Sequence, residues 1–226
     1  MKIEVITTYY REEFLAPLFM RHYEGWADTI TVITARFPED KMDDEIKKNL
    51  INAAIDNSDA DWVIVVDFDE FVFPLPLGTG PRKALEDEPG HKIRCDMRRM
   101  WRHESESDVD RMKPPLFQRL HGMPDHVKPC IFKPRGVTID IGTHAARFPP
   151  HYAWGKPWSA AHWHNADPCF SIQRSYEHRQ TRLSFRQQGL VPEWKDRGYI
   201  ERLYPEHLHD PQVITPVNCP WFGCPL

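Results

Sequence analysis

The run Trp62–Val66 (WVIVV) restricts the possible folds of this chain more than any other feature of its sequence. Five consecutive apolar residues are typical of a β-strand whose two faces are both buried. A strand of this kind needs cover on both sides, which helices supply in sheets built from alternating strands and helices. The run therefore predicts an α/β protein with this segment inside a covered sheet.

Two strand–helix units precede this run and indicate how the sheet begins. Residues 3–7 and 29–34 are typical of strands, and residues 12–23 and 43–55 carry apolar side chains at helical spacing. Strand, helix, strand, helix and strand within 66 residues indicate a parallel, Rossmann-like sheet. Ligands bind such sheets at the carboxyl ends of the strands, so we expect the segments that follow the three strands to meet at one rim.

The remaining sequence predicts a looser arrangement. We expect a short helix over 82–87, a strand over 93–101, a hairpin of short strands from 128–133 and 136–141, and a long amphipathic helix over 171–188. The length of 226 residues suits one compact domain. We place this domain at residues 1–203 and expect the Pro-rich residues 204–226 to form a C-terminal extension packed on it.

Composition and charge narrow the range of partners. The formal net charge of −4 argues against non-specific coating of nucleic acid, which needs a broad basic surface. No run of about 18 apolar residues is present, and the N-terminus becomes polar too early for a signal peptide, so we expect no membrane span and no leader. Five widely spaced cysteines are typical of free thiols in a reducing compartment. The sequence therefore predicts a cytoplasmic protein.

Two carboxylates follow the apolar run and indicate its chemistry. Asp67 and Asp69 are two residues apart, and such residues point the same way in an extended segment. Paired carboxylates suit Mn²⁺ or Mg²⁺ that already carries a diphosphate, and such an ion can neutralise charge on a leaving diphosphate as a Lewis acid. The alternative is a pair of acidic residues that merely ends a strand.

The segment Asp67–Phe71 (DFDEF) resembles the DxDEF strand of family 2-like GT-A glycosyltransferases. Three further segments are similar to parts of that family: Arg11–Leu15 with His22, Lys128–Pro134 followed by Gly142–His144, and His162–His164 (HWH). The resemblance covers residues 1–189. It implies a GT-A fold, which is Rossmann-like, with a mixed, mainly parallel central sheet flanked by helices.

The same resemblance implies an activity and roles for residues. The activity is metal-dependent transfer of a sugar from a nucleoside-diphosphate sugar to an acceptor hydroxyl. Asp67 would approach the donor ribose or the metal, and Asp69 would be the main metal ligand. Thr7, Thr8 and Tyr9 would lie near the nucleotide.

Other residues are candidates for the same site. His144, His162 and His164 are candidate metal ligands, because His binds Mn²⁺ well beside carboxylates. Lys128 is a candidate diphosphate contact, and Glu104 is a candidate base that would take the proton of the acceptor hydroxyl. For each of them a structural His, a surface Lys or a solvated acidic loop is the alternative interpretation.

The acceptor and two rival functions stay open. We expect the acceptor side to come from the second half of the chain, including the basic segment 94–113 and the C-terminal tail. The acceptor would be a saccharide, a lipid-linked glycan, a protein or a modified nucleic-acid base. A haloacid-dehalogenase-type phosphohydrolase would use Asp67 as its nucleophile, although that motif normally lies on the first strand of its chain. A non-catalytic binding module on the same scaffold is the second rival, and a metallohydrolase built on His162 and His164 ranks below both.

Overall fold

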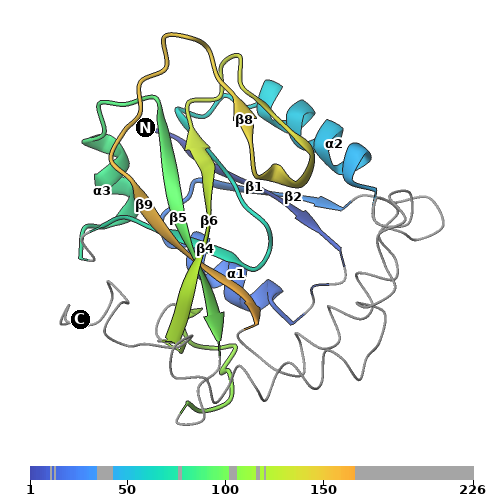
Figure 1. Cartoon of the computed structure of the whole chain (residues 1–226), viewed down its shortest axis with the longest axis vertical. Coiled ribbons are helices and arrows are strands. Elements are labelled where there is room, and N and C mark those ends of the chain that lie inside the picture. The colour runs from blue at the N-terminus through green and yellow to red at the C-terminus, as the bar shows by residue number, and fades with distance from the viewer. Residues whose placement is uncertain are drawn as a thin grey trace.

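The computed structural model describes residues 1–165 apart from 11, 13, 35–42, 76–77, 102–105, 116–117 and 120, and the side chains of residues 101, 121, 123, 164 and 165 are also left undescribed. Glu104, the expected helix over 171–188 and the Pro-rich residues 204–226 lie outside the described residues. The described elements (Figure 1) follow in the order β1 (Ile3–Tyr9), α1 (Ala16–Tyr23), β2 (Thr29–Thr34), α2 (Asp44–Asp56), β3 (Trp62–Val65), β4 (Glu70–Phe73), α3 (Pro81–Glu86), β5 (Lys92–Trp101), β6 (His121–Phe132), β7 (Thr138–Ile139), the short 3-10 helix η3 (Ile141–Thr143), β8 (Ala146–Arg147) and β9 (Trp158–Asn165).

Within the described residues, one seven-stranded sheet has the order β2-β1-β3-β6-β5-β9-β4, and β7 pairs with β8 in a separate ribbon. β1 pairs in parallel with β2 and β3, and β5 with β9. β6 runs antiparallel to β3 and β5, and β4 runs antiparallel to β9. The sheet is mixed, as predicted, and compatible with a Rossmann-like fold. Because three of these six pairings are antiparallel, the expectation of a mainly parallel sheet is wrong: the parallel pairings are those of β2-β1-β3 and of β5 with β9.

The unbroken apolar sequence of β3 is explained by cover on both of its faces. Trp62 and Ile64 pack in a core cluster with residues of α1 and α3, whereas Val63 and Val65 pack in a second cluster with Ile51 of α2. This division follows from the alternation of side chains along a strand. The helices α1 and α2 therefore cover opposite faces of the β1–β3 region (Figure 1), and the prediction for this strand is confirmed.

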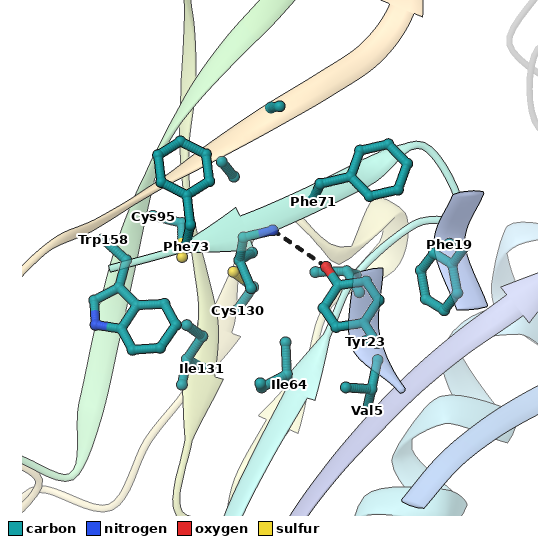
Figure 2. Packing of buried hydrophobic residues seen from close by; sticks show 14 of the residues in the cluster. Val5, Phe19, Tyr23, Ile64, Phe71, Phe73, Cys95, Cys130, Ile131 and Trp158 are labelled. Carbon is teal, nitrogen blue, oxygen red and sulfur yellow. Dashed lines mark hydrogen bonds between the residues drawn. The ribbon is translucent and has the colours of Figure 1, made fainter. Parts of the chain in front are cut away.

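A buried phenol ties β4 to α1. The hydroxyl of Tyr23 donates to the carbonyl oxygen of Glu70 at 2.7 Å and accepts from the N–H of Val72 at 3.2 Å. The dashed line in Figure 2 marks the hydrogen bond that this hydroxyl accepts. Burial raises the pKa of Tyr23, so the hydroxyl keeps the proton that it donates. Around it, Phe71 and Phe73 pack among aromatic and apolar residues of the larger cluster (Figure 2). These contacts fix the start of β4, where Glu70 lies.

Several local expectations need correction. The hairpin expected from residues 128–133 and 136–141 is wrong, because β6 is one long strand between β3 and β5, and β7 pairs with β8 instead. A turn, in which the N–H of Val137 donates to the carbonyl oxygen of Pro134, separates the two segments. The first helix begins only at Ala16, where Pro17 occupies its first turn.

The second helix was placed correctly. The side chain of Asp43 accepts hydrogen bonds from the N–H groups of Glu45 and Ile46 and so caps α2. None of the helices in the described part of the chain has the length and apolar character needed to cross a membrane.

Candidate functional site

Asp67 follows β3 directly, and its carboxylate lies between two ammonium groups. Lys47 of α2 donates to Oδ1 at 2.6 Å, and Nζ of Lys128, on β6, lies 3.6 Å from Oδ2. Burial alone would raise the pKa of Asp67, but the charges of Lys128 and Lys47 outweigh burial and hold the pKa well below its usual range. The carboxylate is therefore ionised throughout the neutral pH range.

Lys128 is a buried cation shared by two carboxylates. Its Nζ donates to Oε2 of Glu70 at 2.6 Å, and the two side chains are 0% and 1% exposed. The same Oε2 accepts from the N–H of Asp67 at 2.8 Å. Burial would lower the pKa of Lys128, but Asp67 and Glu70 raise it above its ordinary value. The charged pair therefore fixes the turn between β3 and β4 against β6.

A second chain of charges runs through His162, on β9. Its Nε2 lies 3.2 Å from Oδ2 of Asp69, which is buried, and its Nδ1 lies 2.9 Å from Oδ2 of Asp125. Arg99 approaches Asp125 with two nitrogens, at 3.0 Å and 3.3 Å. The pairing of β4 with β9 places Glu70 opposite His162, and this register brings the DxDE segment and the histidine together.

The contacts of His162 require a positive charge between two carboxylates. With Nδ1–H donating to Asp125, a neutral imidazole would present the lone pair of Nε2 to an oxygen of Asp69, which is also an acceptor. A proton on Nε2 resolves this conflict: burial lowers the pKa of His162, but the charge of Asp69 and the hydrogen bonds to Asp125 and Asp69 raise it to about 10. A bound cation would resolve it equally well.

The donor set around His162 suits such a cation. A metal-ligating His characteristically donates its other ring N–H to a carboxylate, as His162 does to Asp125, and this leaves Nε2 directed at the metal. Asp69 would supply a carboxylate oxygen at the same point. Within the described residues no three His, Cys, Asp or Glu side chains are arranged to hold a metal ion, and the side chain of His164 is undescribed.

His144 joins this network through a second histidine. Its Nδ1 lies 3.0 Å from Nε2 of His126, and Nδ1 of His126 lies 3.2 Å from Oδ1 of Asp125. Burial, together with the positive charges of Lys128 and His126, lowers the pKa of His144. A neutral His144 is therefore expected at neutral pH, linked to Asp125 by way of His126.

Irregular pairing of β6 explains how neighbouring residues reach one site. Asp96 of β5 pairs with Val127 of β6, and Arg98 pairs with Pro124. Two steps along β5 therefore correspond to three along β6, and Asp125 and His126 lie in this bulge. A bulge interrupts the alternation of a strand and redirects side chains, which is why bulges are common beside active sites. Asp125 consequently contacts His162, and its neighbour His126 contacts both Asp125 and His144.

The residues expected near the nucleotide lie on β1. Thr7 and Thr8 are buried, and Tyr9 packs the edge of its ring against Phe68 at a centroid distance of 5.5 Å. Their contact with a nucleotide stays a prediction, as does the role of Glu104, which lies outside the described residues.

Sequence reasoning missed four members of the cluster. Lys47, Asp125 and His126 were not singled out, and Arg99 was assigned to a basic segment rather than to a carboxylate. The helical pattern of α2 gives no sign that Lys47 is nearly fully buried. The sequence analysis expected a strand only over 128–133, and Pro124 conceals the earlier part of β6 that carries Asp125, because Pro is unusual inside a sheet.

Comparisons with known proteins give little guidance. No protein-family model matches the sequence, and a search of curated proteins found no match. The crystal structure of S. aureus TarS 1-349 is similar with a TM-score of 0.36 and 11% identity, over 92% of this chain and 82% of that one. The crystal structure of S. aureus TarS is similar with a TM-score of 0.34 and 10% identity, over 92% of this chain and 54% of that one. Likeness at this level establishes neither a family nor an activity for this chain.

Proposed function

We propose that this chain transfers a sugar from a nucleoside-diphosphate sugar to an acceptor hydroxyl, with Mn²⁺ or Mg²⁺ at the carboxyl end of β3. The observation that carries the proposal is the arrangement of Asp69 against His162, whose other nitrogen is held by Asp125. It lies just after a strand of the parallel part of the sheet, at the edge where sheets of this kind bind ligands.

Asp69 and His162 are the residues that would hold the cation, and Asp67 lies two residues before Asp69. When bound, the cation would neutralise charge on the departing diphosphate. Lys47 and Lys128 keep Asp67 ionised and in place, and they add positive charge where the diphosphate would lie. The acceptor base stays a proposal at Glu104.

The balance of charge supports a metal and a diphosphate arriving together. The described network contains four carboxylates, Asp67, Asp69, Glu70 and Asp125, and four cations, Lys47, Lys128, Arg99 and protonated His162. A metal ion bound at Nε2 would displace the proton of His162, so a divalent cation would change the net charge of the network by only +1. A lone diphosphate would add its full negative charge in a partly desolvated place, so a diphosphate is better accommodated together with the cation than alone.

Calorimetry with UDP and GDP, each with and without Mn²⁺, tests the proposal. We expect one nucleotide to bind only when Mn²⁺ is present, and the Asp69→Asn variant, of similar shape, to lose that binding while its circular dichroism is unchanged. Asp59→Asn, which alters a highly exposed carboxylate, is the matched control and should bind as the wild type does.

Failure of both nucleotides to bind with Mn²⁺ would refute the proposal. Hydrolysis of an aryl phosphate with Mg²⁺ would then favour the phosphohydrolase, in which Asp67 is the nucleophile. Absence of both activities would favour the binding module.

A further inference from the structure

We propose that a hollow beside Trp154 is a second binding site, which takes an acidic saccharide. The hollow has a volume of about 490 Å³, within the range of small-ligand pockets. Its lining residues come from β5, from β6 and from the segment before β9: Arg94, Val127, Pro129, Trp154, Gly155 and Pro157.

The hollow lies on the other side of the sheet from the cluster around Asp67. Val127 and Lys128 are consecutive on β6 and pair with the consecutive residues Asp96 and Cys95, so their side chains point to opposite faces. Burial agrees with this, because Lys128 is buried against Glu70 whereas Val127 is exposed. The second site is therefore separate from the proposed transfer site and does not depend on that activity.

Trp154 is presented on a rigid frame. Trp154 is 54% exposed, yet the N–H of Gly155 donates to the carbonyl oxygen of Lys92 at 2.8 Å, and the N–H of His91 donates to that of Ala153 at 2.9 Å. A Cβ on Gly90 would lie 2.6 Å from the backbone nitrogen of Gly155, so the two backbone segments are packed tightly there. An aromatic side chain held in this way loses little conformational entropy when a ligand covers it.

The chemistry of the lining points to a sugar that carries a carboxylate. The indole, Val127 and the two prolines offer an apolar surface for the C–H face of a pyranose ring. Arg94 is exposed and forms a long ion pair, in which its Nε lies 4.0 Å from Oδ1 of Asp96, so a ligand carboxylate would compete with Asp96 for its guanidinium. Nζ of Lys92 lies 4.5 Å from the indole centroid and adds positive charge.

Two other occupants suit the hollow less well. A nucleic-acid strand brings one phosphate per nucleotide and needs a basic track along its backbone, whereas Arg94 is the one cation among the described residues that line this hollow. A proline-rich peptide docks on aromatic surfaces and has no need of the two cations. A uronic-acid unit uses both the flat apolar surface and the positive charge.

Calorimetry of the whole chain with hexagalacturonate, and with neutral cellohexaose for comparison, tests the assignment. We expect hexagalacturonate to bind more tightly than cellohexaose. Trp154→Ala should weaken hexagalacturonate binding about tenfold or more, as truncation of a Trp anchor commonly does, and Trp154→Phe should retain part of the affinity. Arg94→Gln should remove the preference for the acidic chain.

The controls separate this site from the transfer site and from general effects. Met112→Ala and Arg147→Gln alter exposed residues outside the hollow and should leave the affinity unchanged. Asp69→Asn should bind hexagalacturonate as the wild type does, whatever happens to nucleotide binding. No binding of hexagalacturonate to the wild type, equal affinity in Trp154→Ala, or binding of a proline-rich peptide or a thymidine decamer in its place would overturn the proposal.

Discussion

Replacing Lys128 with Met should destabilise the fold strongly, because it leaves a buried carboxylate without its partner. At an effective dielectric constant of about 20, the attraction between Nζ and Glu70 at 2.6 Å is about 6 kcal/mol, and that between Nζ and Asp67 at 3.6 Å is about 5 kcal/mol. Desolvation of the ammonium offsets much of this sum, and removal of one partner of a buried pair costs about 3–5 kcal/mol. We therefore expect the free energy of unfolding to fall by about 4 kcal/mol.

Urea unfolding followed by circular dichroism measures this loss. With a slope of roughly 2 kcal/mol per molar urea, the midpoint should fall by about 2 M. The double variant Lys128→Met/Glu70→Gln removes the stranded charge and should recover about half of the loss or more. Lys156→Met, at an exposed lysine, should stay within about 0.5 kcal/mol of the wild type. A loss below about 1 kcal/mol for Lys128→Met, or equal stability of the single and double variants, would refute the reasoning.

Two further predictions concern histidines. Asp125→Ala should weaken Mn²⁺-dependent nucleotide binding about 10–100-fold in calorimetry, because His162 loses the carboxylate that orients it; unchanged affinity would exclude that role. His22 donates from Nε2 to the carbonyl oxygen of Val72 at 2.9 Å, and burial lowers its pKa to about 4. As the pH falls, His22 is protonated near pH 6.5 in the unfolded chain but only near pH 4 in the folded chain. The free energy of unfolding should therefore keep its full value above pH 6.5 and fall by up to about 3 kcal/mol towards pH 4. Urea midpoints across that range should change less in His22→Phe, and parallel curves for the two proteins would contradict the assignment.

The first third of the fold could be predicted because its signals are local. The periodicities of β1, α1, β2, α2 and β3 lie within each segment, and the apolar run of β3 revealed its burial on both faces. The strands that follow depend on distant partners. β4 has four residues and pairs with β9, and was not expected as a strand; β6 contains Pro124 and Pro129 at its irregular pairings with β5, and only its part within 128–133 was expected.

The candidate site was predictable to a similar extent. Asp67 and Lys128 were both singled out from the sequence, and the structure brings them together, as it does Asp69 and His162. The supporting groups were not predictable, because a Lys on a helix or an Asp in a Pro-containing segment is ordinarily solvated. Lys47 and Asp125 reach the site only through the packing of α2 and the bulge in β6.

The place of β4 in the sheet has a consequence for how the chain is made. β4 emerges from the ribosome soon after β3, but its partner strand β9 follows about 90 residues later. At typical rates of synthesis that interval is roughly 5–20 seconds, during which Phe71, Val72 and Phe73 have no strand to pair with. A nascent chain stalled in this interval exposes an apolar strand edge, and it is therefore the form of this protein most in need of a chaperone.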